Sequence, residues 1–185
     1  MIRMLIFLPF IALIAVVIAW SGLALSGGDS AILLDREAEA LFDAYPDSER
    51  HRELFAEASA MAKVADPMLA RLDPRASVFF AAGAVIVGVH ILVVLRSLPV
   101  LLTLLALGFL LGLLFRERLR QFDHADQHAS PTVSHLAKFV LAGALLYIAI
   151  FCFAPIGVPY WTLYAAFLVA SLGGTLYVAN LPINL

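Results

Sequence analysis

Five long runs of apolar residues divide the sequence. They extend over residues 4–25, 76–95, 98–115, 136–154 and 160–181. A helix that crosses the hydrocarbon of a bilayer needs about 20 mainly apolar residues, and each run approaches that length. Because lipid offers the backbone no hydrogen-bond partner, such runs form helices. The pattern therefore predicts an all-α, polytopic integral membrane protein with about five transmembrane helices.

The last four runs form two pairs, and the two runs of each pair are separated by only a short break. The breaks cover residues 96–99 and 155–159, and both contain proline. They are too short to leave the membrane region, so we expect two transmembrane hairpins, at residues 76–115 and 136–185. The aromatic pair that follows the second break is suited to the lipid headgroup boundary.

The first run, within residues 1–28, has two interpretations. Arg3 precedes the apolar core and small residues lie near position 25, as in a secretory signal. The run is longer than the roughly 7–15 apolar residues of a signal core. The sequence therefore favours a retained N-terminal transmembrane helix, with a cleaved signal or signal anchor as the alternative.

Residues 29–75 have helical periodicity between the first and second runs, and we expect an amphipathic helical insert of two short helices. Such helices either fold against the membrane surface and their own spans or accept a protein partner. The first apolar stripe consists of Leu34, Ala38, Leu41, Phe42 and Tyr45, and the second of Leu54, Phe55, Ala58, Met61, Ala62, Ala65 and Leu69.

Composition narrows the class of protein further. Apolar residues make up 63% of the chain and charged residues 14%, with a net charge of −2. The mean hydropathy of +0.96 is that of a membrane protein. This excludes a soluble globule, a disordered chain and a nucleic-acid binder, and it makes the lipid bilayer the first partner. Cys152 is the one cysteine, so the chain has no internal disulfide framework.

The charged residues gather in two segments, residues 29–75 and 116–138. These hold all 14 acidic residues and ten of the 12 basic ones. With five crossings both segments lie on one side, and the positive-inside rule assigns that side to the cytoplasm. We therefore expect a multi-pass protein of the cell (inner) membrane, with its N-terminus outside and its charged loops cytoplasmic.

The predicted spans contain no Asp or Glu, and His90 is the one histidine that lies well within a span. A haem ligand, a quinone contact and a proton relay are the functional interpretations. A neutral imidazole that bonds to a neighbouring helix is the simpler interpretation. His90 is thus a weak candidate for cofactor binding, and the sequence predicts no cofactor.

The polar loop at residues 116–135 offers two further candidates. His124 and His128 have a helical i, i+4 spacing that suits two metal ligands, but no third ligand is fixed, so they are weak candidates. Arg116, Arg118 and Arg120 follow the third span directly, and we expect them to anchor it at lipid headgroups.

Small residues at i, i+4 spacing occur in three of the spans and predict close helix packing, within the chain or between chains. The pairs are Ala84 with Gly88, Gly108 with Gly112, and Ala170 with Gly174.

No catalytic motif is present: there is no P-loop, GxSxG or HExxH. The sequence therefore favours a non-enzymatic membrane subunit or scaffold of a larger cell-envelope assembly, in secretion, conjugation or envelope biogenesis. Its partners would be membrane proteins or further copies of the chain. A small oligomeric channel or transporter is the alternative, followed by a haem- or quinone-binding redox subunit.

Overall fold

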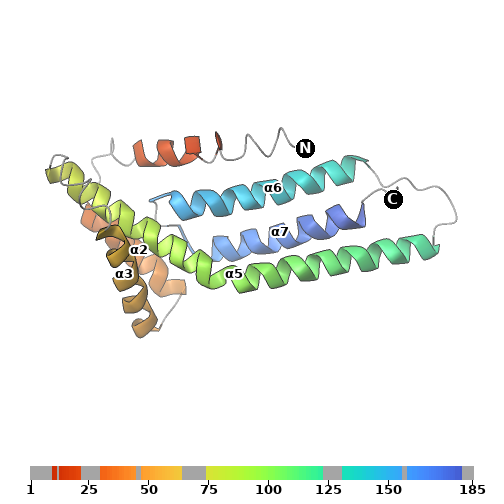
Figure 1. Cartoon of the computed structure of the whole chain (residues 1–185), viewed down its shortest axis with the longest axis horizontal. Helices are drawn as coiled ribbons and strands as arrows, with labels where there is room; N and C mark the ends of the chain where they lie inside the picture. Colours follow the sequence, from red (N-terminus) through yellow and green to blue (C-terminus); the bar gives the residue numbers. More distant parts are fainter. Residues whose placement is uncertain are drawn as a thin grey trace. The chain divides into compact units, whose positions relative to one another are not determined.

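The computed structural model describes residues 10–11, 13–21, 30–44, 47–63, 74–122, 131–155 and 158–180. All regular elements in these ranges are helices (Figure 1), as the sequence predicted. Residues 10–11 and 13–21 are helical, followed by α2 (Ser30–Ala44), α3 (Ser48–Ala62), α5 (Pro74–Phe122), α6 (Pro131–Phe153) and α7 (Trp161–Ala179).

Three of these helices are long and apolar enough to cross a membrane. The qualifying stretches are Ser77–Arg118, Thr132–Phe153 and Trp161–Ala179. By length and composition these helices agree with the predicted class of membrane protein. The last two stretches correspond to the predicted fourth and fifth spans, which the structure separates at residues 154–160.

The second and third predicted spans are one helix. α5 continues through 49 residues with Pro99 in its interior, so the predicted turn at residues 96–99, and with it the first hairpin, is wrong. A proline within a helix removes one hydrogen bond and crowds the carbonyl four residues earlier, which kinks a helix without reversing it. No glycine accompanies Pro99 in that break to help the chain turn. The count of five spans therefore loses its basis.

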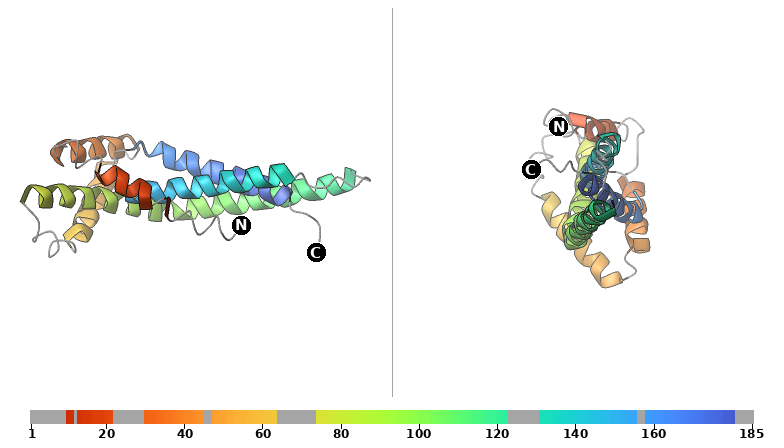
Figure 2. Two further views of the ribbon diagram at one scale, coloured as in Figure 1. Left: turned by 90° about the horizontal axis from the view of Figure 1, so that it is seen from above. Right: turned by 90° about the vertical axis from the view of Figure 1, so that its right-hand side faces the viewer.

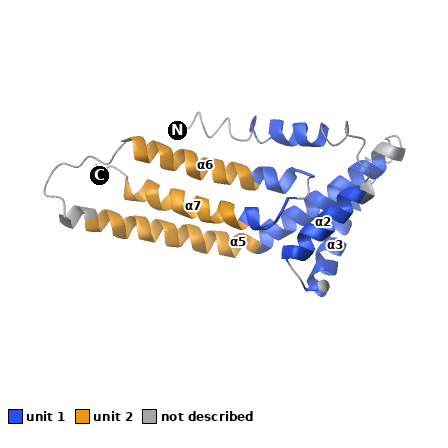
Figure 3. Cartoon of the chain, turned by 180° about the vertical axis from the view of Figure 1, so that it is seen from behind, with its two compact units in different colours: residues 1–96, 149–163 blue, residues 97–148, 164–185 orange. Residues whose placement is uncertain are grey.

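The chain forms two compact units, and α5 contributes to both (Figure 3). Unit 1 comprises Met1–Arg96 and Ala149–Leu163, and unit 2 comprises Ser97–Ile148 and Tyr164–Leu185. Within unit 2 the second half of α5, α6 and α7 lie side by side (Figures 1 and 2).

Close contact between α5 and α7 holds unit 2 together. A Cβ added to Gly108 would lie 2.5 Å from the carbonyl oxygen of Ser171, and one added to Gly112 would lie 2.7 Å from that of Thr175. The Ser171 hydroxyl donates to the Leu104 carbonyl at 2.6 Å, and the Thr175 hydroxyl to the Gly108 carbonyl at 2.9 Å. The glycines thus admit a backbone approach that lets hydroxyls bond across the helices.

Unit 1 contains α2 and α3 in the region of the expected insert. The Asp47 carboxylate accepts from the Glu49 amide at 3.1 Å and caps the start of α3. Of the predicted stripes, Leu41, Leu54 and Ala58 are buried, whereas Phe42 and Met61 are about half exposed. Tyr45, Ala65 and Leu69 lie outside the described residues.

Candidate functional site

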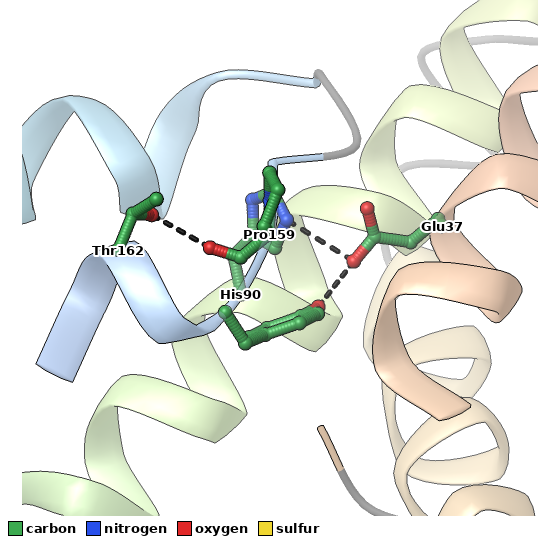
Figure 4. Close-up of polar contacts among 5 residues, drawn as sticks. Glu37, His90, Pro159 and Thr162 are labelled. Carbon is green, nitrogen blue, oxygen red and sulfur yellow. Dashed lines mark hydrogen bonds and ion pairs between the residues drawn. The ribbon is translucent and has the colours of Figure 1, made fainter. Parts of the chain in front are cut away.

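Three polar side chains meet in the interior of unit 1. Glu37 comes from α2, His90 from α5 and Tyr160 from the residue that precedes α7. Glu37 and His90 are 0% exposed and Tyr160 is 1% exposed, so water does not reach any of them. We call these three residues the polar cluster; Figure 4 shows Glu37 and His90 facing each other from separate helices.

The spacing of apolar residues explains why Glu37 and His90 lie on the buried faces of their helices. Glu37 follows Leu34 by three residues and precedes Leu41 by four, which places it on the buried face of α2. His90 lies on the same face of α5 as the fully buried Ile86 and Val93.

Tyr160 is held by the start of α7. The amide of Leu163 donates to the Tyr160 carbonyl at 3.1 Å. Both the amide and the hydroxyl of Thr162 donate to the Pro159 carbonyl, at 3.0 and 2.6 Å, and the hydroxyl bond is drawn in Figure 4. These bonds fix the backbone on both sides of the tyrosine.

Within the polar cluster, one carboxylate oxygen has two neighbours. The Tyr160 hydroxyl donates to Oε1 of Glu37. Nε2 of His90 lies 3.1 Å from the same oxygen, at ion-pair distance but without the alignment of a hydrogen bond. Oε2 of Glu37 and Nδ1 of His90 have no partner among the described residues. Unpaired buried polar atoms each carry a cost of about 1–3 kcal/mol.

Aromatic rings enclose the imidazole. The Phe151 ring stacks on His90 with centroids 4.5 Å apart and an interplanar angle of 28°, and Tyr160 meets His90 edge-on at 5.8 Å. With one face of the ring covered and Nε2 only 3.1 Å from a carboxylate oxygen, the geometry gives no support to His90 as a haem ligand. It places an imidazole and a carboxylate close enough to share a proton.

A second polar contact joins the insert to α5 within unit 1. One guanidinium nitrogen of Arg96 lies 3.0 Å from each carboxylate oxygen of Glu57. Both side chains are about half exposed, so solvent weakens this pair. Close by, a Cβ added to Gly88 would lie 3.2 Å from that of Ala58, so α3 and α5 approach closely.

The structure places the other predicted packing residues as follows. Gly108 and Gly112 face α7, Gly174 lies opposite the Phe109 ring, and Ala170 is buried. Gly88 faces α3, which is not one of the predicted spans. Ala84 lines an apolar groove of about 680 Å³ in unit 1, whose other walls include Trp20, Met61 and Phe153.

The predicted headgroup and metal residues are only partly described. Arg116 is half-buried and Arg118 is exposed, near the end of α5. The side chain of Arg120, together with His124 and His128, lies outside the described residues.

Sequence reasoning missed Glu37. Glu37 was counted among the charged residues of the insert, but it was not assigned to either face of its helix. The available signal was the spacing: Glu37 interrupts the stripe formed by Leu34 and Leu41. A lone carboxylate at a buried helical position requires a partner.

No family model, curated protein or solved structure matches this chain.

Proposed function

We propose that this protein is a non-enzymatic integral membrane subunit that acts as a scaffold in a larger cell-envelope assembly. The supporting observation is the attachment of α2 and α3 to α5. The polar cluster fastens α2, and the pair of Glu57 with Arg96 fastens α3. The buried side chains of the polar cluster are suited to holding a surface in place, because no substrate can reach them.

The face that this attachment leaves outward is charged and carries an excess of carboxylates. Because anionic lipid repels carboxylates, this face suits a polar, partner-binding surface more than a lipid-binding one. Its exposed charged residues are Asp35, Arg36, Glu39 and Asp43 on α2 and Glu49, Arg50, Arg52, Glu53 and Glu57 on α3.

For the membrane topology, we infer that α5 crosses once, through its second half. Ten large apolar side chains are exposed between Leu98 and Phe115, against three between Ser77 and Arg96. Lipid is the solvent that suits the richer half. Residues 29–75 and 116–135 then lie on opposite sides of the membrane, in place of the shared side expected from five crossings.

Two contacts within unit 1 support this arrangement. Arg96 pairs with Glu57, although five crossings would separate them. Tyr160, beside the break that joins α6 and α7, bonds to Glu37 of the insert. We propose that this side is the cytoplasm of an inner membrane, since seven of the 12 basic residues belong to it: Arg36, Arg50, Arg52, Lys63, Arg71, Arg75 and Arg96.

Site-specific photo-crosslinking in native membranes tests the scaffold. A photoreactive residue replaces Glu39 or Glu53 on the outward face, and a matched one replaces the lipid-facing Leu168, which is 54% exposed on α7. We expect defined protein adducts from the first two positions and not from the third. If the outward face yields only adducts with further copies of the chain, the larger assembly is contradicted and an oligomeric protein is favoured.

A further inference from the structure

We propose that the polar cluster is a latch for α2 that closes when Glu37 and His90 share exactly one dissociable proton. The two side chains come from different helices and lie 3.1 Å apart with no exposed surface. The inference is independent of the scaffold proposal, because it concerns how α2 is held and not what binds to it.

Counting protons gives the charge of the closed latch. One proton on the pair makes it neutral overall, as carboxylate with imidazolium or as carboxylic acid with imidazole. A second proton gives a net charge of +1, and loss of the last proton gives −1. A net charge sealed among apolar side chains is strongly unfavourable, whereas a balanced pair is tolerated. Docking of α2 should therefore be strongest at intermediate pH and weaken on both sides.

Among the described residues, nothing else that faces the pair supplies a balancing charge. From α6 it meets the Phe151 ring, and from the start of α7 it meets Tyr160, whose hydroxyl already donates to Glu37. On α3, His51 stacks on Phe42 with ring centroids 5.8 Å apart, and so belongs to another contact.

The other charged side chains that the structure describes on α2, α3 and the first half of α5 are either paired with another residue or exposed to solvent. Arg96 on α5 is paired with Glu57 of α3. The other charged residues of α2 are exposed to solvent, as are those of α3: they are Asp35, Arg36, Glu39 and Asp43, then Glu49, Arg50, Arg52, Glu53 and Lys63.

The latch is also poised to open. In the docked state Oε2 of Glu37 and Nδ1 of His90 have no partner among the described residues, and both would gain water if α2 moved away. This unmet hydrogen bonding offsets part of the stability from burial of Leu41 and its neighbours. A change in one proton can then shift the balance between docked and undocked α2.

Distance measurements between two spin labels test the latch in the full chain, reconstituted in lipid nanodiscs. In a Cys152→Ala background, labels replace Glu39 on α2 and Trp161 on α7, both exposed and both in unit 1. The pH series runs from about 3 to about 9, because an exposed glutamate, with a pKa of about 4.3, must be almost fully protonated at the acidic end for a tenfold effect. At intermediate pH we expect a narrow distance distribution, which marks docked α2. At both extremes of pH the ratio of docked to undocked α2 should fall at least about tenfold.

Each single substitution should keep the pH response on one side, acidic or alkaline, and lose it on the other. Glu37→Gln leaves only the imidazole to titrate, so α2 should undock at acidic pH and stay docked at alkaline pH. His90→Gln leaves only the carboxyl, so α2 should stay docked at acidic pH and undock at alkaline pH. The double variant should lose the response. Tyr160→Phe keeps both titrating groups, so its profile should remain two-sided with a smaller docked population.

Two control variants separate the latch from other titrations. His51→Asn and Glu57→Gln should retain the two-sided profile. The proposal is overturned if the distance does not respond to pH, or if Glu37→Gln undocks α2 at alkaline pH and His90→Gln undocks it at acidic pH. It is likewise overturned if His51→Asn abolishes the response. It is also overturned if each chain holds one divalent metal ion whose removal by a chelator abolishes docking, because a metal would then replace the proton.

Discussion

Gly108 provides a direct test of how unit 2 is packed. Replacement by alanine adds a single Cβ, which would lie 2.5 Å from the Ser171 carbonyl oxygen and 2.7 Å from its hydroxyl oxygen. Backbone cannot yield as a flexible side chain does, so α7 must move away from α5. Gly143 on α6 is a matched control, because a Cβ there would meet nothing within 4 Å.

The expected magnitude combines three effects. Overpacking costs about 1–3 kcal/mol. Two hydroxyl bonds between α5 and α7 weaken, each worth about 0.6 kcal/mol within a membrane. Alanine gains about 1 kcal/mol over glycine in helix propensity. Gly108→Ala should therefore lower the free energy of unfolding by about 1–3 kcal/mol, while Gly143→Ala should leave it unchanged or raise it by up to about 1 kcal/mol.

Equilibrium unfolding in mixed micelles, followed by circular dichroism, measures both variants against the unmodified chain. The decisive quantity is the difference between the two substitutions, since lipid and detergent effects are common to both. Equal stability of Gly108→Ala and Gly143→Ala would refute the close approach of α5 and α7. Gly112→Ala, whose Cβ would lie 2.7 Å from the Thr175 carbonyl oxygen, should repeat the result for Gly108.

Further predictions address the topology and the polar contacts. Cysteines that replace Glu53 and Asp126 in a Cys152→Ala background should react with a membrane-impermeant maleimide from opposite sides of sealed vesicles; labelling from one side would restore an even number of crossings between them. Thr175→Ala should lower the free energy of unfolding in micelles by about 0.6 kcal/mol, because it deletes one hydroxyl bond to α5, and a loss above about 2 kcal/mol would mean that the bond is not the main effect. Glu57→Gln should change the unfolding free energy by less than about 1 kcal/mol, as expected for a half-exposed pair. His90→Leu should cost about 3 kcal/mol or more at neutral pH, because Glu37 then stays buried with only the Tyr160 hydroxyl and no imidazole beside it. Similar losses for the two variants would contradict the difference in burial.

The sequence predicted best what depends on local composition. The apolar runs at residues 136–154 and 160–181 correspond to α6 and α7, because runs of that length in lipid have one stable form. The predicted turn at residues 96–99 was wrong because a proline is compatible with a kink as well as with a turn. The sequence around Pro99 does not decide between the two, whereas the structure has a continuous helix there. The polar cluster joins residues up to 123 positions apart, so its assembly depends on tertiary contacts. Of its members the sequence singled out only His90 in advance; the carboxylate of Glu37 was missed, although its place in the apolar stripe of Leu34 and Leu41 could have marked it.

The length of α5 gives the insert a physical purpose. A straight helix of 49 residues is about 74 Å long, more than twice the roughly 30 Å of bilayer hydrocarbon. Ordinary helix tilts of about 20° do not close this difference. The apolar residues of one half of α5 must therefore be buried against other parts of the protein and not against lipid. The first half carries His90 and Arg96, and α2 and α3 bring the carboxylates that meet them. Ile86, Val89 and Val93 of this half are buried, as are Leu41 of α2 and Leu54 and Ala58 of α3. If α2 undocks, Leu41 and the apolar surface that it covers become exposed, so a proton on the polar cluster would control exposure of an apolar surface.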